Sequence, residues 1–136
     1  MRWRAAPAFL MCMSMQLQAA SQPGDPASTA MGALLPRDSP AAAVFRGGLV
    51  FTNYCVTCHG MNADGTGRAA RLYNPRPANL RTSDKNEAYI LMMIRLGGQA
   101  MGRSEFMPPW GAELTEEQMN DLTAYLRSIN SARAAK

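Results

Sequence analysis

The amino-acid sequence predicts an all-α chain of three or four helices. Two helix-start signals support this: Ser39 followed by Pro40, and Thr115 followed three residues later by Gln118. A stripe of apolar residues then follows at helical spacing: Met119, Leu122, Tyr125, Leu126 and Ile129. No segment reads as a convincing β-strand. An apolar content of 47% in 136 residues is ordinary for a globular chain.

The first 20 residues are typical of an export signal. Arg2 and Arg4 precede an apolar run over residues 5–13, and small residues at 19–21 could hold a cleavage site. The run is shorter than the roughly 18–20 residues that a membrane span requires. We therefore expect residues 1–20 to be a removed signal peptide, and the alternative is an uncleaved membrane anchor.

Residues 21–38 are rich in proline, glycine, serine and alanine, which predicts a flexible linker because such a composition cannot bury a core. We expect one folded domain over residues 39–132. Its first helix runs from Ser39 toward Cys55. Gly47 and Gly48 lie inside this helix and weaken it, which suggests that another backbone or ring crosses closely there; the alternative is a mere weak spot in the helix.

Two further helices are expected. Ser83-Asp84 with Glu87 resembles a capping box, and Gly97-Gly98 is a helix-ending pair, so one helix lies between them. The last helix begins at Thr115, where Leu114 and Met119 form a hydrophobic staple.

The strongest chemical signal is Cys55-Val56-Thr57-Cys58-His59. Positions i and i+3 of a helical turn share one face, so both thiols can reach the two vinyl groups on one edge of a porphyrin. The adjacent imidazole can then coordinate the iron. This spacing is the signature of covalent haem attachment. We predict one haem c, held by Cys55 and Cys58 through thioethers, with His59 as an axial iron ligand.

Three other interpretations of the motif explain less. A structural zinc site needs four protein ligands, and the chain has no second cysteine pair and no second histidine. A thioredoxin-like redox pair needs a βαβ pattern. A disulfide between Cys55 and Cys58 would close a very small ring of rarely favourable geometry. Cys12, the remaining cysteine, lies in the predicted leader.

The second iron ligand is predicted to be a methionine, because His59 is the only histidine. A ligand must come from a segment that can bend over the distal face, which favours a loop. Met101 and Met107 lie in such a stretch, and the two prolines after Met107 stiffen its backbone. We expect Met107 to be the ligand, with Met101 as the alternative.

The stretch after the motif is basic, since its arginines have no acidic residue among them: Arg68, Arg71, Arg76 and Arg81. One interpretation is a solvated loop; the other is that an arginine or Tyr73 meets a haem propionate or docks a partner. Removing residues 1–20 lowers the net charge from +4 to +2. The overall charge is therefore weak evidence for a nucleic-acid or other acidic partner.

The order of motifs is more specific than any one of them. It comprises Gly47, Phe51, residues 55–60, residues 64–67, residues 77–80, Ile94 with Gly97, Met107-Pro108, Leu114-Thr115 and residues 124–126. In these features residues 45–130 closely resemble a class I, mitochondrial-type, single-haem cytochrome c of the bacterial periplasmic kind.

The resemblance implies the class I cytochrome c fold, in which three to four helices wrap around a covalently bound haem. It implies N- and C-terminal helices that cross near-perpendicularly, with Gly47 against Tyr125. It also implies a proline carbonyl that accepts a hydrogen bond from the proximal imidazole; Pro77 fits best and Pro75 is close. Tyr73 and Trp110 are further expected haem neighbours.

With both axial positions filled, iron offers substrate no open site, so the expected reaction is outer-sphere transfer of one electron. We expect a periplasmic electron carrier and no enzyme, with redox proteins as donor and acceptor and with no nucleic acid or small-molecule substrate. The membrane is a partner only if the leader is retained. The alternative is a cytochrome subunit of a larger dehydrogenase or terminal oxidase or reductase complex. A five-coordinate gas-binding or peroxidatic haem would require Met107 to be a core residue.

Overall fold

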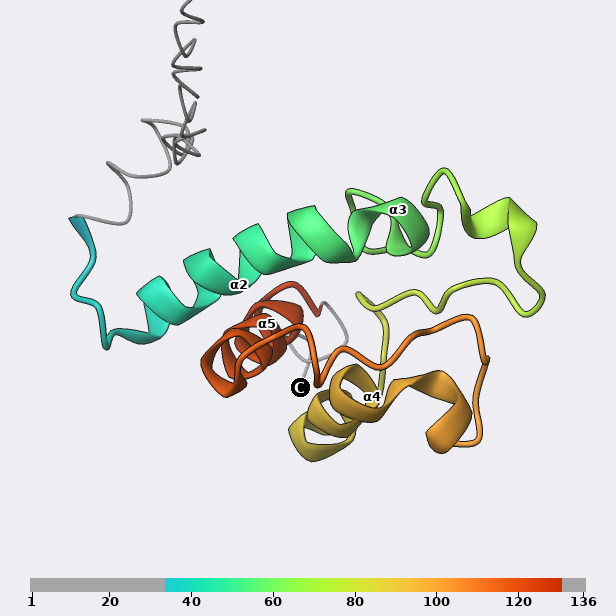
Figure 1. Cartoon of the computed structure of the whole chain (residues 1–136). Helices are drawn as coiled ribbons and strands as arrows, with labels where there is room; N and C mark the ends of the chain where they lie inside the picture. The colour runs from blue at the N-terminus through green and yellow to red at the C-terminus, as the bar shows by residue number, and fades with distance from the viewer. Residues whose placement is uncertain (1–33, 131–136) are drawn as a thin grey trace, which may run out of the picture.

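The computed structural model describes residues 34–130, and these are helical with no strand (Figure 1). The elements are α2 (Pro40–Tyr54), α3 (Val56–His59), the 3-10 helix η1 (Ala70–Leu72), α4 (Glu87–Ala100) and α5 (Glu116–Ser128). The all-α prediction is confirmed. None of these described helices combines the length and the apolar character that crossing a bilayer demands. The predicted leader and most of the predicted linker lie outside the described residues, so their boundaries remain predictions.

Helix α2 starts where its sequence signal places it. The Ser39 hydroxyl accepts a hydrogen bond from the amide of Ala42 at 3.1 Å, and Pro40 occupies the first helical position. The helix ends at Tyr54, and the amide of Cys55 donates to the Phe51 carbonyl at 2.9 Å. The short helix α3 follows at once, so Cys55 lies at the junction as the cap of both helices, and the rest of the motif forms α3.

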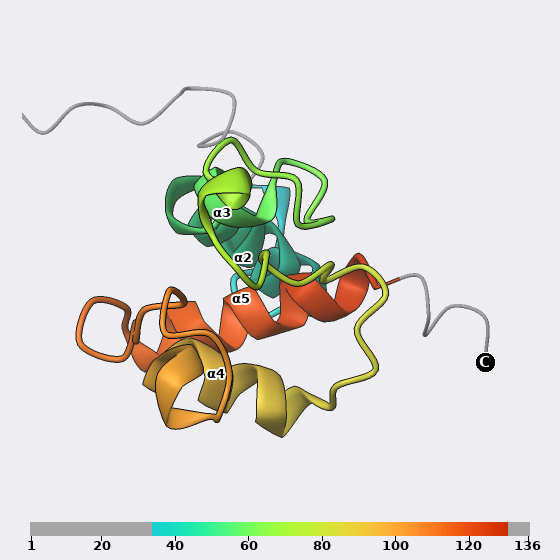
Figure 2. The ribbon, with the colours of Figure 1, turned by 90° about the vertical axis from the view of Figure 1, so that its right-hand side faces the viewer.

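Helices α2 and α5 form the most extensive contact between described helices. Helix α2 lies across the view in Figure 1, whereas α5 lies across the view after the 90° turn of Figure 2, so the two helices cross. A Cβ atom on buried Gly47 would lie 2.0 Å from the Asp121 carbonyl oxygen and 2.8 Å from the Tyr125 Cβ. The expected approach of Gly47 to Tyr125 is confirmed, and it explains the two glycines inside α2.

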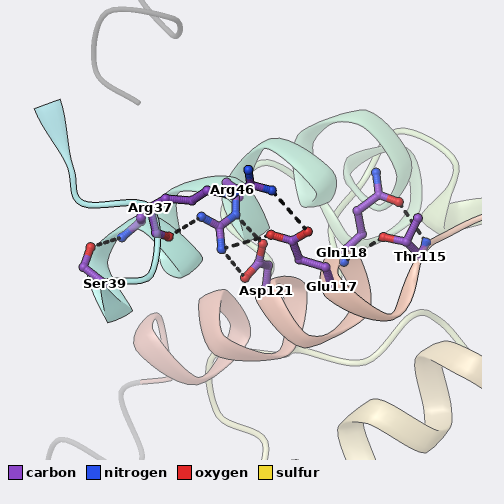
Figure 3. A network of polar contacts seen from close by, with 8 residues as sticks. Arg37, Ser39, Arg46, Thr115, Glu117, Gln118 and Asp121 are labelled. Atoms are coloured by element: carbon purple, nitrogen blue, oxygen red, sulfur yellow. Dashed lines mark hydrogen bonds and ion pairs between the residues drawn. The ribbon is translucent and has the colours of Figure 1, made fainter. Parts of the chain in front are cut away.

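A polar network joins the same two helices (Figure 3). Arg46 Nε lies 2.6 Å from Asp121 Oδ2 and Arg46 Nη2 lies 3.0 Å from Asp121 Oδ1, a bidentate pair. Arg46 Nη1 also donates to the carbonyl of Arg37 at 2.8 Å. The Asp121 side chain is only 8% exposed, so this fork compensates the burial of its charge. No local sequence pattern indicates this pair, because its residues lie 75 positions apart.

The predicted start of helix α4 at Ser83-Asp84 was two to three residues early. Helix α4 begins at Glu87, and its N-cap is Asn86, whose side chain accepts from the Tyr89 amide at 2.9 Å. The Ser83 hydroxyl instead accepts from the Lys85 amide at 3.3 Å in the turn before the helix. Ser83 therefore stabilises this turn, and the helix starts only after it.

Regular helical geometry in α4 breaks at Gly97, as the glycine pair predicted. Gly97 has φ +76°, a left-handed value that favours glycine. A Cβ there would lie 2.7 Å from the nitrogen of Pro109 and 2.8 Å from the Met107 carbonyl oxygen. The glycine thus lets residues 107–109 pack directly on the end of the helix.

The capping box of α5 is confirmed. Thr115 Oγ1 accepts from the amide of Gln118 at 3.2 Å, and Gln118 Oε1 accepts from the amide of Thr115 at 2.9 Å. The apolar stripe of α5 faces a core that α2 and α4 also line. The buried members of this core are Val50, Phe51, Ala63, Ile94, Leu114, Met119, Leu122 and Leu126.

Candidate haem-binding site

The junction of α2 and α3 carries the two thiols and the imidazole of the motif. The amides of Cys58 and His59 both donate to the Cys55 carbonyl, at 3.2 Å and 2.9 Å, so the three residues share one turn. Both cysteines are free thiols, and all three side chains are half-buried. The structure therefore keeps the thiols on the same turn without a disulfide, as haem attachment requires.

The thiol chemistry of Cys55 argues against the redox interpretation. Burial, and secondarily the neighbouring Cys58, raises the pKa of Cys55 to about 12. A thiol with so high a pKa stays protonated at neutral pH, and it is then a poor nucleophile. Within residues 34–130, no three His, Cys, Asp or Glu side chains gather into a group that could hold a metal ion.

The imidazole of His59 is oriented by a backbone carbonyl. Its Nδ1 lies 3.1 Å from the Ala78 carbonyl oxygen. A proton on Nδ1 donates to that oxygen, which leaves the lone pair of Nε2 available to a metal. Burial lowers the pKa of His59, against the opposing effect of the Ala78 bond, so the ring is neutral at pH 7. A neutral, oriented imidazole is the form that haem iron requires, and the donor set fits a haem.

The carbonyl that holds the imidazole corrects the sequence expectation. The resemblance implied Pro77, with Pro75 close, but the acceptor is Ala78, the next residue along. The Pro77 carbonyl lies against Gly65, where an added Cβ would stand 2.4 Å from its oxygen. Gly65 also has φ +85°, a left-handed value that favours glycine, so both the space and the backbone conformation restrict this position to glycine.

A loop clamps the carbonyl end of α3. The amides of Gly65, Gly67 and Ala69 donate to the carbonyls of His59, Cys58 and Thr57 at 2.8, 3.2 and 3.0 Å. These carbonyls are the ones that a helix end leaves without intrahelical partners. No residue pattern in the sequence indicates that this loop holds the carbonyl end of α3, because all three bonds are between backbone groups.

Two further predicted site residues, Tyr73 and Trp110, each pack against another aromatic ring. The Tyr73 and Phe106 rings lie with centroids 5.0 Å apart, and the Tyr54 and Trp110 rings are 5.4 Å apart in an edge-on arrangement. Tyr54 immediately precedes Cys55. The loop that carries Met107 is therefore held at one end to the segment after η1 and at the other to the motif.

Neither candidate methionine lies inside a regular helix, as expected for a ligand. Met107 is half-buried, and its carbonyl accepts from the amide of Gly98 at 2.8 Å. Met101, also half-buried, is the C-cap of α4. Sequence reasoning missed Phe106 and Tyr54 as the partners of Tyr73 and Trp110. The available signal was that each is an aromatic residue adjacent to a predicted iron ligand or thioether cysteine.

Several known proteins are similar to this chain over the residues that include this site. A family model described as cytochrome c oxidase, cbb3-type, subunit III matches residues 42–126. The cbb3-type cytochrome c oxidase subunit FixP of Azorhizobium caulinodans is 31% identical over 98 residues, which cover 72% of this chain and 30% of that protein. Cytochrome c-554(547) of Halothiobacillus neapolitanus is 30% identical over 79 residues, which cover 55% of this chain and 84% of that protein.

A solved structure is also similar. A reducing HAO-like protein complex of Kuenenia stuttgartiensis contains a chain with a TM-score of 0.56 and 28% sequence identity. The match covers 67% of this chain and 44% of that chain. This chain thus spans less than half the length of that chain and less than a third of FixP.

Proposed function

The chain belongs to the cbb3-type cytochrome c oxidase subunit III family and is a c-type cytochrome, and from this premise we propose how it works. It holds one haem c covalently through Cys55 and Cys58. It carries one electron at a time between redox proteins of the periplasm, and it catalyses no reaction of its own. The chemistry that haem c supplies when bound is the one-electron change of its iron.

The observation that carries this proposal is the hydrogen bond between His59 Nδ1 and the Ala78 carbonyl. It fixes the tautomer and leaves Nε2 free on a ring adjacent to two reduced thiols of the same turn. The backbone bonds from the loop to α3 support the same role, because they restrain the turn that presents all three side chains.

Met107 is the proposed second axial ligand, with Met101 as the alternative. Two aromatic pairs hold both ends of the loop around Met107, and Pro108 and Pro109 reduce the conformational entropy that ligation would cost. A thioether sulfur stabilises Fe(II) and raises the reduction potential. If His59 and Met107 both held the iron, the haem would supply electron transfer without binding a substrate.

The test begins with visible spectra of the oxidised and reduced protein and a pyridine haemochrome, after expression in a host with a haem-attachment system. We expect one haem c per chain, and none in a Cys55→Ser/Cys58→Ser variant. Met107→Ala should abolish the sulfur-to-iron band at the red end of the oxidised spectrum, whereas Met101→Ala should retain it. A colourless wild-type protein would refute the proposal, and the opposite pattern in the two methionine variants would transfer the ligand role to Met101.

A second candidate function is that of a cytochrome subunit within a larger enzyme complex. The similarity to FixP and to the HAO-like complex favours it, since both are named as parts of assemblies. Size-exclusion chromatography of the native protein from its own cells separates the two. A free carrier elutes near the 14.8 kDa of the chain, whereas a subunit co-elutes with other redox proteins.

The periplasmic location is supported by the basic and apolar pattern of residues 1–20. Cell fractionation of the full chain and of a chain without these residues tests it. We expect haem-loaded protein in the periplasmic fraction only when the leader is present. Haem-loaded protein retained in the cytoplasm by both chains would contradict the location.

A further inference from the structure

The arginines of the described residues divide into two groups. Most have partners: Arg37 and Arg46 pair with Glu117 and Asp121, Arg95 with Glu116, Arg103 with the Tyr89 hydroxyl, and Arg127 with Glu87. Arg81 also has an interaction. Arg68, Arg71 and Arg76 differ: across residues 34–130 none of their side chains makes a hydrogen bond or an ion pair, and all three residues are exposed.

These three arginines line one recess. Its volume is about 330 Å³, and its walls are Thr66, Gly67, Arg68, Ala70, Arg71 and Arg76. No acidic side chain lines it, and the sequence has no acidic residue between Asp64 and Asp84. Three positive charges gathered without a local carboxylate repel one another and attract anions. The recess is therefore a local region of positive electrostatic potential, in a chain whose formal net charge is only +4.

The recess lies beside the haem-attachment turn. Its wall residue Gly67 donates to the Cys58 carbonyl at 3.2 Å, and the adjacent Ala69 donates to the Thr57 carbonyl at 3.0 Å. Figure 1 shows η1, which contains Arg71, beyond α3 at the outer end of the molecule and away from α5. A molecule bound at the recess would thus contact the loop around Gly67, which is hydrogen-bonded to the Cys58 carbonyl.

We propose that this recess binds an acidic surface patch of the redox partner protein. The guanidinium groups of Arg68, Arg71 and Arg76 form ion pairs with the carboxylates of that patch. Guanidinium groups bind carboxylates through paired hydrogen bonds. They are also more weakly hydrated than the ammonium group of lysine, so removing their water on binding costs less free energy. An exposed arginine binds a single anion weakly in water, so several carboxylates on one partner are needed for useful affinity. The inference rests on the proposed electron-transfer function and specifies its partner.

The test compares two triple variants of the haem-loaded protein. Arg68→Gln/Arg71→Gln/Arg76→Gln removes the recess charges. Lys85→Gln/Arg103→Gln/Arg127→Gln removes the same charge from positions just before α4, just after α4 and within α5. The control breaks only partly exposed pairs, which contribute little to stability. Circular dichroism of each variant reports its fold, and Arg68→Lys/Arg71→Lys/Arg76→Lys keeps the recess charge without the fork geometry.

The probes are a polyglutamate peptide of about ten residues and inorganic phosphate, titrated at low ionic strength and followed by NMR. We expect the peptide to shift signals of residues 66–76, and its Kd to rise roughly tenfold in the recess variant and less than about threefold in the control. Equal losses in both glutamine variants would overturn the inference, since only net charge would then matter. Phosphate binding as tight as peptide binding would also overturn it, in favour of a small-anion site.

The visible spectrum of the wild-type protein keeps the two proposals separate. Haem-free wild-type protein would defeat the proposed function. Haem-loaded wild-type protein whose peptide affinity does not depend on the three arginines would defeat only the docking inference.

Discussion

Replacing Gly47 by alanine should separate the two principal helices. The added methyl would lie 2.0 Å from the carbonyl oxygen of Asp121 and 2.5 Å from its carbonyl carbon. Favourable contacts between heavy atoms lie at about 3.5–4.0 Å, so the overlap exceeds an ångström. The obstructing atoms are backbone, which cannot rotate aside as a side chain could. Helix α5 must therefore shift, and the shift disturbs the core contacts of both helices.

The expected size of the effect follows from two opposing contributions. Alanine favours a helix over glycine by roughly 0.5–1 kcal/mol. Overpacking typically costs about 1–3 kcal/mol, and contact with a fixed backbone belongs at the upper end of that range. We expect a net loss of about 2 kcal/mol in the free energy of unfolding. For a domain of this size, that loss lowers the Tm by roughly 8–16 °C.

Gly48→Ala is the matched control, because a Cβ there would meet only the Tyr125 ring, at 3.4 Å. This variant retains the helix-propensity gain and should be neutral or slightly stabilised. Guanidinium unfolding of the haem-loaded proteins, followed by far-ultraviolet circular dichroism, gives the midpoint and slope for each. Equal midpoints for the two variants would show that α2 and α5 do not approach as closely as described.

Three further changes test other contacts. Arg46→Gln should lower the free energy of unfolding by about 1–3 kcal/mol in chemical denaturation, because buried Asp121 loses its bidentate charged partner. Arg46→Lys should cause an intermediate loss. No change in either variant would mean that solvent hydrogen-bonds the carboxylate instead. Thr115→Ala should cost about 1 kcal/mol and Thr115→Ser much less, so equal losses would rule out the hydroxyl cap. Hydrogen bonds from the Thr66 hydroxyl and amide lower the pKa of Asp64, so its stabilisation is present above the ordinary carboxyl pKa near 3.8 and is lost as pH falls through the folded value. Asp64→Asn should therefore flatten the stability curve of acid titrations below that pH, and an unaltered curve would count against the contribution.

Local sequence signals predicted the helix starts correctly where a single side chain could cap the free backbone amides. Ser39 with Pro40 and Thr115 with Gln118 each supply the hydrogen bonds that a helix start lacks, so their positions were right. The start of α4 was placed two to three residues early, because Ser83, Asp84 and Asn86 can all cap a helix. Only the geometry of the chain decides which of them does so.

The candidate site shows where such reasoning stops. Spacing alone puts Cys55, Cys58 and His59 on one turn, because that relation is local. The groups that orient them come from elsewhere: Ala78 contributes a carbonyl, and Gly67 contributes an amide. Backbone groups are the same in every residue, so no side-chain pattern distinguishes the peptide that will face the imidazole.

The two candidate methionines illustrate how tertiary contacts add to a local preference. Sequence favours Met107 because prolines follow it, and the structure adds that an added Cβ on Gly98 would lie only 3.1 Å from the Met107 Cβ. The amide of Trp110 donates to the Ile94 carbonyl at 2.9 Å, so the chain after Met107 is fastened to α4 as well. The backbone holds Met101 as well, because its amide donates to the Gly98 carbonyl at 3.1 Å. A ligand held before binding loses less entropy when it binds, so the stiffening by Pro108 and Pro109 remains the reason for predicting Met107 as the sulfur donor.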